Sequence, residues 1–216
     1  MATKHAHESR IYSQFSVLYD QIFTNVFSPR INKVIGAMKI EPGSQVLEVG
    51  VGTGLSLAAY PFHCDVVGVD LAPDMLVRAR RKVEVSGWEH VELAVGDAQA
   101  LQFPDDCFDY VTSFHVVSVV PDPQAMVREM ARVCRPGGRL VIINHFQSPR
   151  RLVSSVVDRL DPITRFLGWR TTLSAAELLE DVDLEDVQRF KTSPTSLFTV
   201  MIARKPHPDP RVRAFG

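Results

Sequence analysis

The hydrophobic positions of this chain fall into two recurring patterns, short apolar runs and longer stretches with helical spacing. Helical patterns are predicted over 73–86 and 123–135. Five runs are apolar on both faces, as expected for strands covered by helices on both sides: Gln45–Val49, Asp65–Asp70, Val91–Val95, Phe108–Phe114 and Arg139–Asn144. Because short strands alternate with helices, the pattern predicts an α/β fold with a mostly parallel sheet.

Capping and turn residues mark where some of these elements begin and end. Asp122 precedes Pro123, the pattern of a helix N-cap followed by proline at the first helical position. The Arg-Pro-Gly-Gly sequence at 135–138 is expected to end that helix.

The last part of the chain predicts one more helix and two strands. Ser174 and Glu177 form a capping-box pattern, which favours a helix over 175–181. Two β-branched runs at 186–192 and 197–203 are expected to form a closing hairpin.

Two amphipathic segments lie outside this alternation. In residues 8–28, apolar side chains recur at helical spacing on one face. In residues 149–170, five arginines against two aspartates give a local charge of +3. Both patterns are typical of helices that lie on a membrane surface. We predict an N-terminal lid or membrane-contact segment at 1–36, a globular domain at 37–204 that contains the basic insertion, and a flexible tail at 205–216.

Composition describes an ordinary globular protein. The chain has 216 residues, 45% of them hydrophobic, with 24 basic and 25 acidic side chains. This balance argues against binding nucleic acid through bulk positive charge. The longest apolar run is far short of the roughly 20 residues that a bilayer helix needs. The N-terminus lacks the apolar region of a signal peptide, so a cytoplasmic location is expected. The three cysteines and seven histidines show no metal-ligand spacing, and no metal is expected.

The sharpest chemical signal is a glycine-rich turn directly after a predicted buried strand. Gly50, Gly52 and Gly54 occupy alternate positions. Glycines there let the backbone approach a ligand, because a Cβ would block the approach or forbid the turn. The spacing departs from the dinucleotide pattern G-x-G-x-x-G. Glu48, two residues before the first glycine, suits a ligand that carries an ammonium group and no pyrophosphate.

Two further acids follow the next strands. Asp70 ends the second strand, where a carboxylate can accept hydrogen bonds from both hydroxyls of a ribose. Asp97, after the third strand, can accept a hydrogen bond from an exocyclic amine. Since ligands of α/β sheets bind at the carboxyl ends of the strands, these acids and the glycine turn predict one site.

With these residues the chain resembles the class I S-adenosylmethionine-dependent methyltransferases, over roughly residues 40–145. The blocks at 96–104, 108–111 and 135–140 are also similar to that family. The resemblance implies a Rossmann-like fold, a seven-stranded sheet with the last strand antiparallel and helices on both faces. It implies S-adenosylmethionine as cofactor, with S-adenosylhomocysteine as product. It further implies these cofactor-binding residues: Glu48, Gly50, Gly52, Thr53, Gly54, Asp70, Leu71, Met75, Gly96, Asp97 and Ala98.

Shorter pieces of the chain point to a substrate class. The segments 55–57, 117–123 and 144–146 are similar to bacterial phospholipid N-methyltransferases, which convert phosphatidylethanolamine stepwise to phosphatidylcholine. Such enzymes work at the membrane surface, which agrees with the two amphipathic segments. We therefore expect a phospholipid substrate and a monomer bound peripherally to the anionic inner face of the cytoplasmic membrane.

N-methylation of an amine requires that its proton is removed first, because an ammonium nitrogen has no lone pair. His115, after the fourth strand, and His145, after the fifth, are candidates for contact with the amine. Tyr19 could orient the amine through its hydroxyl or hold a methylated ammonium against its ring. The candidates for the lipid phosphate are Arg151, Arg150 and Arg30. For each of these side chains, a structural role in the core or on a solvated face is the alternative.

Two other functions remain open from the sequence. One is methylation of another lipophilic acceptor, such as a quinone-precursor ring. The basic residues near Arg150 favour an anionic headgroup over a neutral ring. The other is a non-catalytic S-adenosylmethionine sensor or membrane-binding module, which the intact glycine turn with its three acids makes less favourable.

Overall fold

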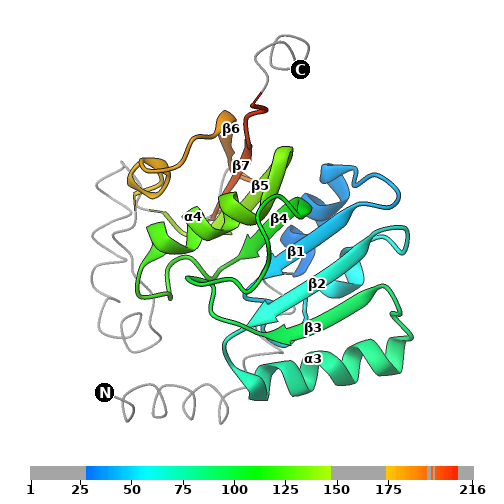
Figure 1. Ribbon diagram of the computed structural model, residues 1–216. Coiled ribbons are helices and arrows are strands. Elements are labelled where there is room, and N and C mark those ends of the chain that lie inside the picture. The colour runs from blue at the N-terminus through cyan, green and yellow to red at the C-terminus, as the bar shows by residue number, and fades with distance from the viewer. Residues whose placement is uncertain (1–27, 147–173, 194–195, 197, 209–216) are drawn as a thin grey trace. The chain divides into compact units, whose positions relative to one another are not determined.

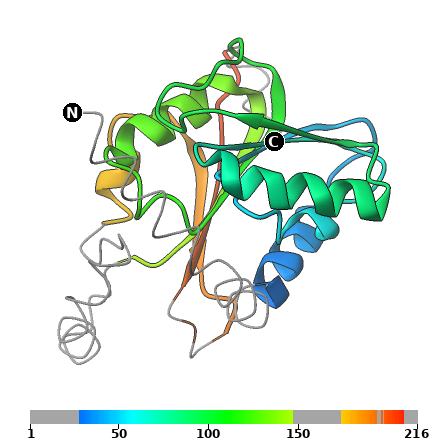
Figure 2. The same ribbon diagram turned by 90° about the horizontal axis from the view of Figure 1, so that it is seen from below.

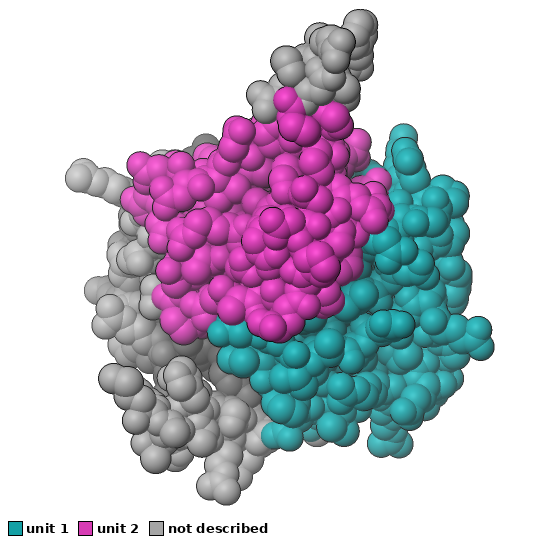
Figure 3. Space-filling view, viewed as in Figure 1, with its two compact units in different colours: residues 1–97 teal, residues 98–216 magenta. Residues whose placement is uncertain are grey.

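The structure is a computed structural model that describes residues 28–146, 174–193, 196 and 198–208 (Figures 1 and 2). Almost all of the amphipathic segment at 8–28, and all of the basic segment at 149–170, lie outside the described residues. The chain divides into two compact units, residues 1–97 and 98–216 (Figure 3). The boundaries proposed from the sequence at 36 and 204 stay predictions.

The first unit contains three parallel strands in the order β3-β2-β1, namely β1 (Gln45–Val49), β2 (Asp65–Asp70) and β3 (Val91–Val95). All three have the predicted bounds. The short 3-10 helix η1 (Leu57–Ala59) follows β1. A helical stretch over 28–38 precedes β1 and buries Ile31, Val34, Ile35 and Met38, whose spacing is that of one helix face.

Helix α3 (Pro73–Ser86) packs against β3 and β2, as Figure 1 shows, and also has the predicted bounds. It begins with proline in its first turn and ends at Gly87, which adopts a left-handed conformation with a φ of 64°. Glycine takes this conformation without the steric cost that a Cβ brings, so the helix ends there. Leu76 and Ala79 are the residues that α3 buries. Because α3 follows β2 after only two residues, its first turn lies beside the carboxyl end of that strand.

The second unit contains four strands in the order β4-β5-β7-β6. They are β4 (Phe108–Phe114), β5 (Cys134–Asn144), β6 (Glu185–Phe190) and β7 (Thr199–Arg204). β4 and β5 are parallel, and β7 is antiparallel to β5 and β6. Over the described residues the strand order is β3-β2-β1-β4-β5-β7-β6. The predicted Rossmann-like sheet with an antiparallel last strand is confirmed.

Helix α4 (Pro123–Val133) begins as the sequence predicts. The Asp122 side chain accepts a hydrogen bond of 2.9 Å from the Ala125 N–H. The predicted end was wrong by two residues, because the chain becomes extended at Cys134. The Arg-Pro-Gly-Gly segment belongs to β5, where the pairing register with β4 shifts. Gly137, with a φ of 81°, allows this irregularity in the strand.

The helix predicted over 175–181 was also wrong. The structure has only the 3-10 turn η2 (Glu177–Leu179) at this point. In a capping box the Ser174 hydroxyl would accept from the Glu177 N–H. It accepts instead from the Ala176 N–H, at 3.3 Å, which favours a tight turn over a regular helix.

Candidate cofactor and active site

The glycine-rich turn at 50–54 is held against β2 by backbone hydrogen bonds. The Gly50 and Val51 N–H groups both donate to the Val69 carbonyl, at 2.8 and 2.9 Å. The Gly54 N–H donates to the Val51 carbonyl at 2.9 Å, which closes the turn. These bonds tie the turn to the carboxyl end of the neighbouring strand.

Two of the glycines are required for different reasons. Gly52 has a φ of 54°, and a Cβ built there would have nothing within 4 Å, so the space beside it is open. Gly54 has a φ of 75°, and a Cβ there would lie 2.7 Å from the Leu57 side chain and 3.2 Å from the Ala79 Cβ. Gly54 therefore permits close packing, whereas Gly52 leaves backbone open to a ligand.

Asp70 is fixed at the end of β2 by backbone hydrogen bonds from Gly52, Leu71 and Ala72. The Gly52 N–H donates to one carboxylate oxygen at 2.8 Å, and the Ala72 N–H donates to the other at 2.9 Å. Burial raises the pKa of Asp70 from its usual value, and the backbone hydrogen bonds oppose this change. The carboxylate has more acceptor sites than these backbone N–H groups fill, so a ligand hydroxyl can still donate to it, which suits the predicted ribose contact.

Glu48 lies in the interior, with 2% of its surface exposed. The Ser56 hydroxyl donates to one of its oxygens at 2.6 Å, and the Tyr60 hydroxyl donates to the other at 2.7 Å. Burial raises the pKa of Glu48 from 4.5 to about 7; the charge of Asp70 adds to this effect, and the two hydroxyls oppose it. Sequence reasoning missed both hydroxyl residues. Their only signal was a polar side chain in a largely apolar segment.

Apolar side chains lie next to these acids at the ends of β2 and β3. Leu71 is 64% exposed and Val95 is 54% exposed. Val95 is the sheet partner of Asp70, and the Gly96 N–H donates to the Asp70 carbonyl at 3.0 Å. Such exposed apolar groups beside carboxylates suit a flat ring attached to a ribose. Sequence analysis missed Val95.

The other predicted cofactor residues of the first unit belong to the same strand ends. Thr53 is buried in the glycine turn, with 4% of its surface exposed. Met75 is half-buried in the first turn of α3, and Asp97 follows Gly96 directly after β3. Two buried carboxyls with raised pKa values favour a positively charged ligand, because a cation stabilises their ionised forms. S-adenosylmethionine, with its sulfonium and ammonium groups, fits this requirement.

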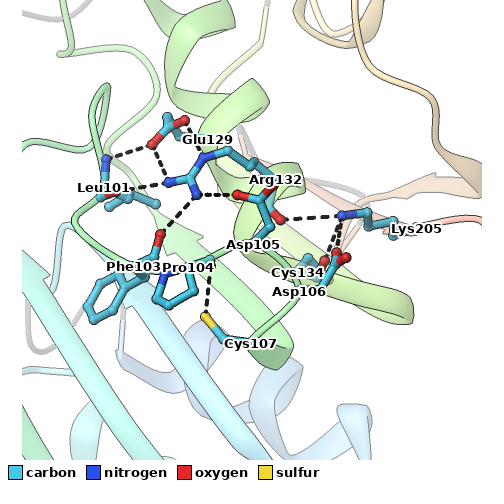
Figure 4. Close-up of polar contacts among 10 residues, drawn as sticks. All are labelled: Leu101, Phe103, Pro104, Asp105, Asp106, Cys107, Glu129, Arg132, Cys134 and Lys205. Carbon is cyan, nitrogen blue, oxygen red and sulfur yellow. Dashed lines mark hydrogen bonds and ion pairs between the residues drawn. The ribbon is translucent and has the colours of Figure 1, made fainter.

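Arg132 from α4 holds the segment after Asp97 in place (Figure 4). This segment begins with the predicted site residue Ala98. The guanidinium group donates to the Leu101 and Phe103 carbonyls, at 2.9 Å each. It also forms ion pairs with Asp105, at 2.7 Å, and Glu129, at 2.8 Å. Three of the hydrogen bonds from this planar group go to the loop, and the two to Glu129 orient the guanidinium group on α4.

The two predicted histidines lie in the second unit, and both lie near one aromatic ring. His115 directly follows β4 with a φ of 64°, and its N–H donates to the Ile143 carbonyl at 2.7 Å. The centroid of the Phe198 ring lies 4.6 Å from that of His115 and 6.3 Å from that of His145, edge-on to each. Burial lowers the pKa of His145, and the charge of Lys191 adds to this effect. Sequence analysis missed Phe198, because no local pattern links it to the histidines.

The remaining predicted site residues are only partly described. Arg30 lies half-buried in the helical stretch at 28–38. Tyr19, Arg150 and Arg151 lie outside the described residues. Within the part of the chain that the structure describes, no group of three or more potential metal ligands comes together, and no helix is long and apolar enough to cross a membrane.

Comparison with known proteins agrees with this geometry. A model of a methyltransferase domain matches residues 47–142. A phosphatidylethanolamine N-methyltransferase of Cereibacter sphaeroides is 44% identical over 195 residues, which cover 89% of this chain and 95% of the relative. A demethylmenaquinone methyltransferase of Bacillus cereus is 34% identical over 151 residues, 65% of this chain and 64% of the relative.

A solved structure shows the same fold. It is that of a phosphoethanolamine N-methyltransferase of Haemonchus contortus in complex with phosphomonomethylethanolamine and S-adenosylhomocysteine. The TM-score is 0.72 at 20% identity, over 90% of this chain and 58% of that chain. The sheet order and the glycine turn define a Rossmann-like nucleotide-binding protein. The chain belongs to the family of S-adenosylmethionine-dependent methyltransferases, and S-adenosylmethionine is its methyl donor.

Proposed function

We propose that the protein methylates the headgroup nitrogen of phosphatidylethanolamine, stepwise towards phosphatidylcholine, at a membrane surface. The observation that carries this proposal is the 44% identity to the phosphatidylethanolamine N-methyltransferase, which extends over 89% of the chain. A shared fold and cofactor site alone require similarity only around the strand ends. Similarity over nearly the full length of both chains therefore supports a shared acceptor.

In this proposal the residues at the ends of β1, β2 and β3 hold the methyl donor, which supplies a methyl group on a positively charged sulfur. The glycine turn, which includes Thr53, binds the methionine part of the donor. Glu48 lies in β1, directly before this turn. Asp70 binds the ribose. The adenine lies against Leu71 and Met75 from one strand end, and against Gly96, Asp97 and Ala98 from the next. Two features support this assignment: the space beside Gly52 is open, and a hydrogen bond from the turn fixes the Asp70 carboxylate.

A histidine is the proton acceptor in this proposal. The substrate amine binds as an ammonium ion and must lose a proton before its lone pair can attack the methyl carbon. The lowered pKa of His145 keeps its imidazole neutral near pH 7, so a ring nitrogen can accept that proton and release it to solvent. His115 is the second candidate, and Phe198 packs against both rings. Tyr19 orients the amine or holds the methylated ammonium against its ring.

The membrane part of the proposal rests on charge patterning. The amphipathic segment within 1–36 and the basic segment at 149–170 dock the protein on anionic lipid at the inner face of the cytoplasmic membrane. Arg150 and Arg151, with Arg30, bind the phosphate of the lipid headgroup. The protein acts as a monomer in this proposal.

The direct test is mass spectrometry of lipids after the purified protein is incubated with S-adenosylmethionine. The vesicles contain phosphatidylethanolamine and an anionic lipid. We expect mass gains of one, two or three methyl groups on the headgroup. A protein that binds the cofactor but leaves these lipids unchanged would contradict the proposed acceptor.

A second acceptor class is favoured by a specific observation, the 34% identity to demethylmenaquinone methyltransferases. In that case the acceptor would be the ring of a quinone precursor. The match covers only 65% of this chain, compared with 89% for the phospholipid enzyme. Adding demethylmenaquinone to the same vesicles separates the two functions, because only the methylated acceptor gains mass.

A further inference from the structure

A buried cluster of three side chains joins the end of β1 to the residues that follow the glycine turn. Glu48 lies in the last part of β1, before the turn, whereas Ser56 and Tyr60 follow it. Only 2% of Glu48, 2% of Ser56 and 3% of Tyr60 is exposed. The two hydroxyls donate to different oxygens of the carboxyl group, at 2.6 and 2.7 Å. The chain therefore leaves β1, forms the turn, and returns to the strand that it left.

We propose that Ser56 and Tyr60 are positioning residues of the cofactor site, which act by binding the Glu48 carboxyl and thereby hold the turn at 50–54 ready for the ligand. The proposal rests on the cofactor role assigned to that turn above. It extends the site to two residues that make their contribution through another side chain.

The hydrogen bonds around the turn support this role. The bonds from Gly50 and Val51 to the Val69 carbonyl, and from Gly52 to Asp70, anchor the turn to β2. The carboxyl of Glu48 supplies the anchor for the residues that leave the turn. A buried carboxyl must be hydrogen-bonded to be tolerated in the interior, so the hydroxyl pair and the acid depend on each other.

Charge couples this cluster to the ligand. The groups that act on Glu48 are the Ser56 and Tyr60 hydroxyls and the Asp70 carboxylate. The hydroxyls stabilise the ionised carboxyl, and the burial and Asp70 oppose ionisation. An ionised Glu48 attracts, through the backbone of the turn, the ammonium group that S-adenosylmethionine and S-adenosylhomocysteine share. Loss of one hydroxyl is therefore expected to raise the pH at which Glu48 ionises, and so to change the pH dependence of ligand binding.

The test compares hydroxyl deletions inside and outside the cluster. Tyr60→Phe and Ser56→Ala remove the two donors. Tyr110→Phe and Ser113→Ala, in β4, remove hydroxyls from other buried residues that are 8% and 0% exposed. Calorimetry gives the affinity for S-adenosylhomocysteine between about pH 6 and 8. Hydrogen exchange gives the protection of the amides at 52–54 in the ligand-free protein.

For each cluster variant we expect about tenfold weaker binding at pH 7, because the turn loses one of the hydrogen bonds that hold it and Glu48 becomes less ionised. We also expect faster amide exchange in the turn, and a binding profile displaced to higher pH. A non-specific loss of stability would weaken binding without shifting its pH dependence, so the shift distinguishes the two explanations. The control variants are expected to keep the wild-type affinity, exchange and profile.

Two results would overturn the proposal. The first is that the wild-type protein binds S-adenosylhomocysteine and that both cluster variants keep its affinity and its amide protection in the turn. The cofactor assignment would then stand, and the positioning role of Ser56 and Tyr60 would fail. The other is an equal loss of affinity in the control variants. If the wild-type protein fails to bind S-adenosylhomocysteine, the cofactor role of the turn fails. Amide exchange in the ligand-free variants still decides whether the cluster holds the turn.

Discussion

The burial of Glu48 predicts an unusual pH dependence of stability in the ligand-free protein. The perturbation is Glu48→Gln, which keeps the size of the side chain and removes its ionisation. The Gln side chain can still exchange hydrogen bonds with the two hydroxyls, since its amide has both a donor and an acceptor group. The substitution therefore isolates the cost of placing a charge at a site that is 2% exposed.

The magnitude follows from the pKa of Glu48, which burial raises from 4.5 to about 7. Each tenfold change in an ionisation constant is worth about 1.4 kcal/mol, so full ionisation of the folded protein costs roughly 3 kcal/mol. Below pH 4.5 the carboxyl is protonated in both the folded and the unfolded chain. Between pH 4.5 and 7 only the unfolded chain releases the proton, and the free energy of unfolding falls as the pH rises. Above about pH 7 the loss is complete.

The assay is urea unfolding, followed by circular dichroism, at about pH 5, 6.5 and 8 without ligand. Between the lowest and highest pH, the wild-type protein is expected to lose about 2–3 kcal/mol more stability than Glu48→Gln. Glu89→Gln, at an exposed glutamate, is the matched control and should follow the wild-type curve. Parallel curves for the wild-type protein and Glu48→Gln would refute the reasoning, because they would mean that Glu48 ionises in the folded protein as it does in the unfolded chain.

Three further predictions concern the glycine turn, the loop after Asp97 and the membrane. Gly52→Ala should abolish S-adenosylhomocysteine binding in calorimetry, because the new Cβ enters the open space and an alanine at a φ of 54° is strained by about 1–2 kcal/mol. Unchanged affinity would mean that the ligand does not approach Gly52. Arg132→Ala should lower the free energy of unfolding in urea by about 1–3 kcal/mol, since two carbonyls and two carboxylates lose their donor. Arg128→Ala, which removes a more exposed ion pair, should lower it by less. Binding to anionic vesicles in flotation should weaken with added salt, because exposed charges are screened over about 10 Å at 0.1 M, and binding that salt leaves unchanged would contradict docking by the basic segment.

Most of the fold could be predicted from the sequence because strand and helix signals are local. The bounds of β1, β2, β3, β4 and α3 agree with the predictions to the residue. The failures occurred where long-range pairing overrides local signals. The Arg-Pro-Gly-Gly segment carries strong turn residues, yet it lies inside β5, where the register with β4 shifts and Gly137 and Gly138 form hydrogen bonds with the backbone of Lys205.

The candidate site divides in the same way. The glycine turn and Asp70 were predictable, because a turn that brings backbone close to a ligand needs glycine, and because strand ends collect ligand-binding acids. The hydrogen bonds from Ser56 and Tyr60 to Glu48 were not predictable, because no periodic pattern connects residues 8 and 12 positions apart across an irregular turn.

The sequence by itself thus determined the class of fold, the cofactor turn and the acids at the strand ends, since each of these depends on the chemistry of neighbouring residues. Only the tertiary structure decided which side chains share a buried contact. Phe198 meets His115 and His145 because β7 runs antiparallel to β5, and this pairing joins positions more than 50 residues apart along the chain. The burial that raises the pKa of Glu48 likewise arises only when the turn has folded back over the end of β1.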